Sequence, residues 1–266
     1  MQASIIGLSI AFGILFVVFT ALEWVRRRHS ARAVFRAGFF TDVTYWFFTP
    51  VINKVIVPAT LLVIVVPVAV LVYGRVDKGA IQHGFGPLSR LPFWGQAALI
   101  VVTGDFVGYW MHRAFHRGRL WRFHAVHHSS TELDWLSSVR VHPVNEIVMR
   151  LASVAVILPL GLAPLAFASV APFLTLFAIL IHADLDWDWG PLRAVLASPR
   201  FHRWHHTDET AARDKNFAGL LPLWDILFGT YHMPHGQVPS SFGTKTVVGK
   251  NLWAQLWGPF RRQAKA

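Results

Sequence analysis

The hydrophobic and polar positions divide the chain into long apolar runs joined by shorter polar segments. Residues 3–25 carry no charge before Glu23 and are long enough for the roughly 20 residues that a membrane-spanning helix needs. Residues 43–73 form a second apolar run that prolines interrupt, which predicts a short interfacial stretch and then a helix over about 55–73. Because arginines follow the first run instead of preceding it, we expect a retained helix and no cleaved signal peptide.

The later part of the chain continues this pattern. Residues 74–90 contain glycine, proline and charges of both signs, which predicts a loop. Residues 91–111 predict a third apolar helix with Asp105 inside it, and an ionisable residue in a membrane helix indicates a functional role. Residues 147–183 are nearly uncharged and are broken by PLGLAP at 159–164, which predicts a tight helical hairpin that enters the bilayer and returns. The pattern therefore predicts an all-α integral membrane protein with four to five transmembrane or re-entrant helices.

The composition supports the membrane interpretation. Hydrophobic residues make up 54% of the 266 positions and charged residues 15%, against roughly 45–50% and about 25% in an ordinary soluble domain. The absence of cysteine excludes disulfides, thiolate metal ligands and cysteine nucleophiles.

The net charge of +11 raises the question of nucleic-acid binding, so the placement of the basic residues matters. Basic residues gather after apolar runs, which marks the cytoplasmic side of a membrane, and no basic motif interleaved with aromatic residues accompanies them. The two groups are Arg26, Arg27, Arg28, Arg32 and Arg36, and Arg113, Arg117, Arg119 and Arg122. With five basic residues in 26–36 and three in 74–90, we expect the amino terminus outside and segments 112–146 and 184–266 in the cytoplasm. We expect no nucleic-acid partner.

Nine of the 14 histidines fall in four short stretches. These are HRAFH at 112–116, HAVHH at 124–128, the single His182, and HRWHH at 202–206. Positions i, i+3 and i+4 share one face of a helix, so each HxxHH is expected to offer three imidazoles to one point. Imidazole suits iron, zinc, copper and nickel, and this number of ligands exceeds the need of one ion, which predicts two metals close together. His29 and His83 are interpreted as bystanders.

The absent motifs narrow the chemistry. The chain has no HExxH, no GxSxG and no Walker loop, so hydrolysis of a water-soluble substrate is unsupported. Histidine-rich ligation with few carboxylates at a membrane surface fits non-haem iron that activates dioxygen.

Over about residues 91–232 the chain carries a set of motifs in a fixed order. They are Asp105 with Tyr109-Trp110, HRAFH, Leu120-Trp121, HAVHHS, Arg140-x-HP-x-x-Glu146, His182, SPRFHRWHH, Asn216, and WDILFGT at 224–230. As a set they resemble the fatty acid hydroxylase and sterol desaturase superfamily. The resemblance implies a membrane-embedded di-iron oxygenase with a four-helix core and a cytosolic histidine-rich cap that holds the dimetal site. It also implies a lipid substrate and a separate electron-donor protein.

The resemblance further implies a set of iron ligands. They are His112, His116, His124, His127, His128, His202, His205 and His206, with His182 as a ninth. For His142, which precedes Pro143, a ligand role and a helix-start role are weighed equally. One departure is visible: many relatives have asparagine two residues after the equivalent of His182, where this chain has Asp184, so the charge near one metal is expected to differ.

Four polar residues are candidates for holding the metal-bound histidines, because such histidines donate their other ring nitrogen to a carboxylate or carbonyl. Asp105 is the first candidate, since it precedes His112 by seven residues, close to two helical turns. Glu146 and Asp225 are the next, with helix capping or an arginine partner as equal alternatives. Asn216 either orients a ligand or caps a turn.

The leading hypothesis is a multi-pass membrane oxidoreductase that uses two iron ions, dioxygen and external electrons to hydroxylate or desaturate a lipid. The alternatives are a histidine-rich metal transporter or sensor and a purely structural membrane protein. Transport would place ionisable residues through the membrane midplane, whereas only Asp105 approaches a span. Three regions are expected: membrane helices and a loop over 1–90, a catalytic region over 91–235, and a cytosolic tail over 236–266.

Overall fold

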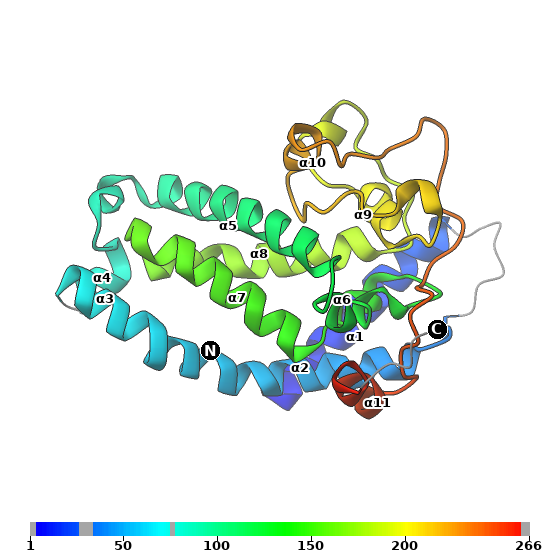
Figure 1. The fold of residues 1–266 in the computed structure, drawn as a ribbon, viewed down its shortest axis with the longest axis horizontal. Coiled ribbons are helices and arrows are strands. Elements are labelled where there is room, and N and C mark those ends of the chain that lie inside the picture. Colours follow the sequence, from blue (N-terminus) through cyan, green and yellow to red (C-terminus); the bar gives the residue numbers. More distant parts are fainter. Residues whose placement is uncertain (1–3, 27–33, 75–77, 262–266) are drawn as a thin grey trace.

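Long helices run lengthwise beside one another, and a cap of short helices and loops covers one end of them (Figure 1). The computed structural model describes residues 4–26, 34–74 and 78–261. The long helices are α1 (Ile5–Arg26), α2 (Phe39–Thr60), α5 (Phe93–Phe115), α7 (Pro143–Ile157) and α8 (Pro164–His182). Within these residues the one β pairing is an isolated bridge between Thr207 and Phe242, so the expected all-α fold class is confirmed.

Among the residues that the structure describes, four helices are long and apolar enough to cross a membrane. They cover Ile5–Val25, Phe39–Val68, Pro143–Leu160 and Pro164–His182. The apolar helix expected over 91–111 is present as α5, but it is not among these four. It carries Gln96 and Asp105 and packs against both α7 and α8.

The second apolar run differs from its expectation. The sequence predicted an interfacial stretch followed by a helix over about 55–73, whereas α2 already begins at Phe39 and contains Pro50 and Pro58. It continues through a π-helical turn, η1 (Leu61–Val65), into α3 (Val66–Tyr73). Each proline removes one backbone donor, and a π turn is a common adjustment at such a point, so the helical run continues.

The segment expected as a loop over 74–90 contains two short helices, α4 (Lys78–His83) and the 3-10 helix η2 (Pro87–Arg90). It packs on the turn between α7 and α8, where the Phe85 amide donates to the Gly161 carbonyl at 2.9 Å. A side chain at Gly84 would lie 2.3 Å from that same carbonyl, and its φ is +85°. The two helices and the turn expected over 147–183 are present, with η5 (Leu158–Leu160) and Gly161 at the turn between α7 and α8.

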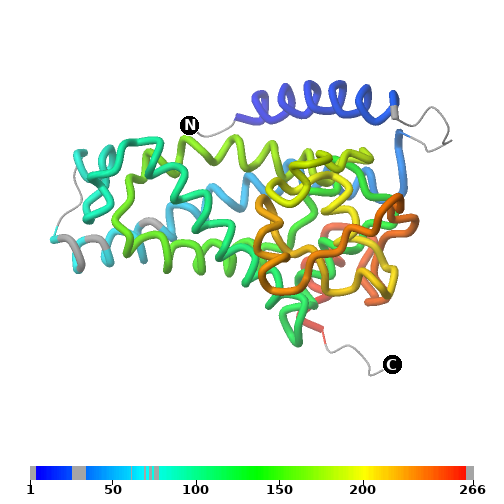
Figure 2. The backbone as a smooth tube through the Cα atoms, turned by 90° about the horizontal axis from the view of Figure 1, so that it is seen from above, coloured from blue at the N-terminus to red at the C-terminus, as the bar shows by residue number. Residues whose placement is uncertain are grey.

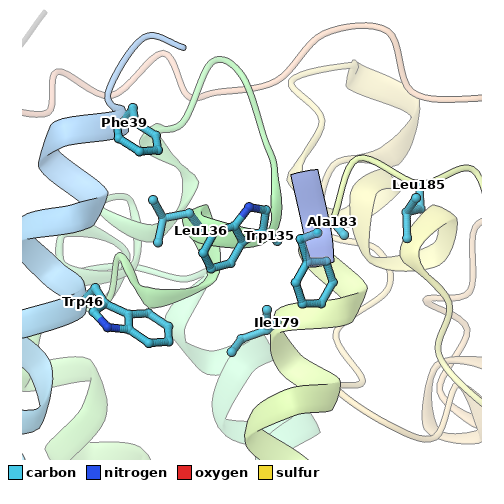
Figure 3. Packing of buried hydrophobic residues seen from close by; sticks show 8 residues of the cluster. Phe39, Trp46, Trp135, Leu136, Ile179, Ala183 and Leu185 are labelled. Carbon is cyan, nitrogen blue, oxygen red and sulfur yellow. The ribbon is translucent and has the colours of Figure 1, made fainter. Parts of the chain in front are cut away.

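The cap consists of short elements. These are α6 (Trp121–His124), η3 (His127–Ser129), η4 (Trp135–Val139), η6 (Gly190–Ala194), α9 (Pro199–His206), η7 (Thr210–Ala212), α10 (Leu223–Leu227), α11 (Leu252–Trp257) and η8 (Gly258–Phe260). An aromatic cluster joins the cap to the membrane helices: Trp135 of η4 stacks on Phe19 of α1 with ring centroids 5.6 Å apart. Figure 3 shows Trp135 beside Leu136, with Trp46 on one side and Ala183 on the other, and Figure 2 shows α1 along one side of the other helices.

The arginines that served to predict the membrane orientation do not all lie at the surface of the protein. Arg27, Arg28, Arg32 and Arg75, together with His29, lie outside the described residues. Arg36 is buried and not a surface charge, because its guanidinium donates to Asp42 at 2.6 Å and also binds Asp134.

Candidate metal centre

The nine clustered histidines meet at the cap end of the long helices. α5 and α8 bring His112 and His182 there from their last turns. α9 is started by Ser198, whose hydroxyl accepts the Phe201 amide at 3.1 Å, and by Pro199 in its first turn. The other members are His116 after α5, His124 on α6, His127 and His128 on η3, and His202, His205 and His206 on α9.

The histidines form two groups, each with ligand atoms within 4.8 Å of one another. The five-histidine group is His112, His116, His124, His128 and His205, and the four-histidine group is His127, His182, His202 and His206. The groups adjoin, because the His128 and His206 rings lie 4.4 Å apart. Nine imidazoles in two groups can hold two metal ions.

The expectation that each HxxHH offers three imidazoles to one point is wrong. In the second motif His202 and His206 join the four-histidine group, while His205 joins the other. On a helix the i+3 and i+4 side chains point about 100° apart, so neighbouring histidines aim at different points. In the first motif α6 also ends at His124, before His127 begins a 3-10 turn. Each motif therefore contributes to both groups.

Most of these rings are oriented through Nδ1. Backbone carbonyls accept from four of them: Phe217 from His112 at 2.7 Å, Arg140 from His127 at 3.1 Å, Ala178 from His182 at 2.6 Å, and Lys215 from His205 at 2.8 Å. A carbonyl only accepts, so Nδ1 carries the proton in each of these rings and Nε2 has a free lone pair. The free lone pairs point into the groups, as metal ligation requires.

The distances between facing nitrogens fit metal binding. The Nε2 atoms of His127 and His182 are 3.2 Å apart, although neither carries a proton to share. Other facing Nε2 pairs lie 2.9 to 3.2 Å apart. Two nitrogens bound at right angles to one ion, each about 2.1 Å from it, are about 3.0 Å apart. The buried Nε2 of His116 has no hydrogen-bond partner within the described part of the chain, which also fits a ligand.

Burial keeps the cap imidazoles neutral. Removal from water lowers the pKa of six of them well below the ordinary 6.5, and the neighbouring imidazoles lower it further. The six are His124, His127, His128, His202, His205 and His206. A neutral imidazole is the form that binds a metal.

Three of the predicted polar candidates act on one segment, residues 215–221, which we call the clamp loop. Asp105 accepts the backbone amides of Leu220 and Leu221 at 2.8 and 2.9 Å. Asp225 accepts those of Phe217 and Ala218, both at 2.8 Å. The Asn216 amide donates to the carbonyls of Phe201 and His232. None of these six hydrogen bonds is to a histidine ring; instead they hold the loop whose Lys215 and Phe217 carbonyls orient His205 and His112.

The other two candidates lie apart from the histidine groups. His142 belongs to neither group, and the structure favours its helix-start alternative. Its Nδ1 accepts the Val144 amide at the start of α7, and its Nε2 is 3.1 Å from the Leu256 carbonyl. Glu146 pairs with Arg150 at 2.6 Å, as in the arginine-partner alternative.

Two ring partners were not predicted from the sequence. The Asn145 side-chain oxygen lies 2.9 Å from His124 Nδ1, and an Asp214 oxygen lies 3.3 Å from His116 Nδ1. Asn145 stands next to Glu146 in the same motif. The motif therefore does supply a partner for a histidine ring, but that partner is Asn145 and not the predicted Glu146. Asp184, the departure from the family pattern, pairs with Arg203 at 2.7 Å. The negative charge of Asp184 is therefore balanced by the positive charge of Arg203, the residue after His202.

A buried ion network, also unpredicted, supports the four-histidine group. Asp42 binds both Arg36 and Arg140, and Asp134 binds Arg36. All four side chains are buried, with Asp42 fully so. Because the Arg140 carbonyl orients His127, the network fixes that ring through the backbone.

A cavity of about 800 Å³ leads from the long helices to both groups. Its inner end is formed by His112, His182 and His202. Most of its wall is apolar and comes from α5, α7 and α8, including Ile100, Val154, Phe177 and Ile181. A cavity of this size and polarity suits a hydrocarbon chain.

The chain is similar to enzymes that modify lipids. An ornithine lipid hydroxylase of Rhizobium tropici is 34% identical over 176 residues, which is 65% of this chain and 53% of the relative. An alkylglycerol monooxygenase of Danio rerio is 37% identical over 52% of this chain and 30% of its own length. A very-long-chain aldehyde decarbonylase of Arabidopsis thaliana is 26% identical over 53% and 25%. The chain thus spans about half or less of these relatives, and they lend no support to the transporter alternative.

No solved structure matches the chain. The family model described as fatty acid hydroxylase matches residues 97–230, which are 134 of the 266 positions and include all nine clustered histidines. The chain therefore belongs to the fatty acid hydroxylase family.

Proposed function

We propose that this protein is a multi-pass membrane oxygenase that holds two iron ions in its two histidine groups and hydroxylates or desaturates a lipid with dioxygen. The observation that carries the proposal is a cluster of nine imidazoles, three of which, His112, His182 and His202, close the inner end of an apolar cavity. The hydroxylase and monooxygenase relatives support the same reaction class.

One set of side chains holds the metal ligands in place, and another set positions the substrate. When bound, the irons supply the reduction of dioxygen and the oxidation of a C–H bond. The clamp loop, Asn145 and the ion network hold the imidazole rings, and Asp105, Asn216 and Asp225 hold the clamp loop. The apolar wall excludes water and aligns a lipid chain along α7 and α8.

Electrons come, in this proposal, from a separate donor protein. Arg117 and Arg119 are exposed directly after His116 and offer a positive surface beside the five-histidine group. A basic surface attracts an acidic partner and speeds its docking. We place this cap on the cytoplasmic side, following the basic residues that succeed the apolar runs. The division into regions 1–90, 91–235 and 236–266 remains part of the proposal.

Lipid profiling of cells tests the function. Cells that express the wild type should contain an oxidised lipid that is absent with His127→Ala and with His205→Ala, one change in each group. His83→Ala is the matched control, because His83 is exposed in α4 outside both groups and should leave the product unchanged. Purified wild type should hold about two irons, one for each group. Another metal in place of iron, with no dioxygen uptake when reductant is supplied, would refute the proposal.

A further inference from the structure

Three large aromatic side chains are exposed together near the carboxyl end of the described chain. Trp253 and Trp257 of α11 and Phe260 of η8 have exposed fractions of 66%, 60% and 59%. Trp253 and Trp257 are four residues apart and so share one side of α11, and the Trp257 and Phe260 rings lie 6.3 Å apart. We call these three residues the aromatic face. Exposed apolar side chains that gather in one place mark an interaction surface.

The opposite side of α11 fixes the aromatic face in its outward position. Leu252 is buried against Tyr45 of α2. The Gln255 side chain is also buried and donates to the Gly249 carbonyl at 2.8 Å. The short helix is therefore amphipathic, with one side packed on the protein and the aromatic face exposed on the other.

α11 lies beside the cap end of a membrane helix, as Figure 1 shows for α2. The Thr41 hydroxyl of α2 donates to the Lys250 carbonyl at 2.9 Å, just before α11 begins. The apolar span Phe39–Val68 has 30 residues and is about 45 Å long, which equals a bilayer with both headgroup regions and exceeds the hydrocarbon core of about 30 Å. Because Asp42 and the ion network belong to the cap end of this span, the excess lies there. α11 is therefore at the level of the lipid headgroups.

Basic residues flank the aromatic face on both sides. Lys250 precedes α11 and Arg261 follows η8, and both are exposed. The sequence continues with Arg262 and Lys265, which lie outside the described residues. Residues 247–266 contain no aspartate or glutamate. A short amphipathic helix with an aromatic face and adjoining cations is typical of segments that lie in the interface of an anionic membrane.

The composition and position of the aromatic face favour a lipid surface over a protein partner. Tryptophan is enriched where membrane meets water, because its ring is apolar and its N–H is polar. The face adjoins α2, and Trp24 at the cap end of α1 is exposed in the same way. We propose that the aromatic face enters the headgroup region of the membrane leaflet on the cap side, and that the flanking cations attract anionic phospholipids to it. This contact goes beyond the proposed oxygenase function and does not depend on it.

Spin labels on the purified protein in lipid nanodiscs measure the depth of the aromatic face. The chain has no cysteine, so one introduced cysteine carries the label. Trp253→Cys and Phe260→Cys each leave two of the three aromatic side chains in place. Gln237→Cys is the control, because Gln237 is exposed in the cap loop before α11. Collisions of the label with oxygen, which concentrates in the bilayer, should exceed those with a water-soluble nickel chelate at both face positions but not at Gln237.

A second substitution tests whether the aromatic side chains hold this depth. Trp257→Ser, added to the labelled Phe260→Cys protein, should move the label towards water. Val247→Ser is the matched control, since Val247 is 90% exposed and apolar but lies outside the aromatic face, so the depth of the label should stay unchanged.

A fluorophore on Phe260→Cys tests the charge of the lipid. The quenchers are doxyl-labelled phosphatidylglycerol, which is anionic, and doxyl-labelled phosphatidylcholine, which has no net charge, each as a minor component of phosphatidylcholine nanodiscs. The anionic lipid should be enriched at the fluorophore by about fivefold or more, the effect of one or more cations near the surface. Arg261→Gln with Arg262→Gln should remove most of this preference. Lys78→Gln with Arg90→Gln, two exposed cations in and after α4, should leave it unchanged.

Three results would overturn the inference. Greater access of the nickel chelate than of oxygen at both face positions would place the aromatic face in water. Low access of both reagents would show that protein, either a partner or a second copy of this chain, covers it. Equal quenching by the two lipids would exclude attraction by the cations. The proposed oxygenase function is tested by iron content and lipid products, so the two failures are distinguishable.

Discussion

The five-histidine and four-histidine groups use the same kind of ligand but are held by different parts of the molecule. In the five-histidine group, His112 and His205 are oriented by carbonyls of the clamp loop, about 105 and 10 residues away along the chain. In the four-histidine group, His182 is oriented by Ala178 of its own helix and His127 by Arg140 of the buried ion network. His112 and His116 are also partly exposed, whereas every member of the four-histidine group is buried.

This difference shows that the two histidine groups depend on separate supports. The clamp loop is positioned by Asp105, Asn216 and Asp225, and its carbonyls reach only the five-histidine group. The ion network ties the start of α2 to η4 and reaches the four-histidine group through Arg140. Damage to one support should therefore weaken metal binding in one histidine group and leave it unchanged in the other.

The largest effect is expected from removing ligands of each group in turn. His205 and His206 are adjacent on α9 but belong to different groups. His205→Ala and His206→Ala should each abolish product formation and lower the iron content by about one of two equivalents. The spectroscopic signal of the remaining iron should differ between the two variants. If both variants lost both irons, the groups would form one inseparable site.

Disruption of the ion network is expected to have a smaller but still severe effect, on both fold stability and metal affinity. Asp42→Asn leaves buried arginines without their full counter-charge, which should lower the free energy of unfolding by about 3–5 kcal/mol. The four-histidine metal should bind about 10- to 100-fold more weakly, as when an outer support of a metal ligand is lost. Asp188→Asn is the matched control, since its pair with Arg200 is partly exposed and should contribute less than about 1 kcal/mol. Thermal unfolding and metal titration measure both quantities.

Damage to the clamp loop should instead weaken metal binding in the five-histidine group, and it should lower the stability of the fold less. Asp225→Asn retains one acceptor oxygen but replaces the other with a donor, so it should lower the free energy of unfolding by about 1–3 kcal/mol. Metal titration should show weaker binding in the five-histidine group only, by about tenfold. Equal weakening of both metals would show that the two supports are coupled.

The sequence predicted the helices and the clustering of the histidines well because their signals are local. Apolar run length predicts α1, α7 and α8, and the proline-rich turn at 159–164 predicts the hairpin. The prolines of α2 were misleading, because a missing backbone bond is tolerated when the helix continues through a π turn. The histidine spacing identified nine side chains that the structure brings together.

The partition of the histidines and their supports could not be predicted, because both depend on distant contacts. The sequence alone did not place His205 with His112 or the Phe217 carbonyl beside the His112 ring. Asp105 shares a face with His112, but its carboxylate turns to the clamp loop, 115 residues later in the chain. Arg36 was counted as a membrane-topology charge, although it is buried in the ion network.

The smallest predicted effect concerns Asp214, the exposed support of the five-histidine group. Its carboxylate lies 3.3 Å from His116 Nδ1, and this hydrogen bond lowers the pKa of Asp214 below its ordinary 3.8. The side chain is 60% exposed, so solvent screens the pair, and Asp214→Asn should cost less than about 1 kcal/mol. Asp214 has a φ of +56°, a conformation that asparagine also tolerates, so the substitution changes charge without straining the backbone.

The lowered pKa of Asp214 determines how the effect of this substitution varies with pH. Because the folded-state pKa of Asp214 is lowered, the stabilisation is complete above about pH 3.8 and is lost only as the pH falls through the folded-state value. Metal titrations of the wild type and of Asp214→Asn should therefore differ by the same factor, up to about fivefold, at pH 6 and at pH 8. A difference that appeared only at pH 8 would mean that another group titrates at this support. Since Asp214 contacts only the five-histidine group, affinity in the four-histidine group should stay unchanged at both pH values.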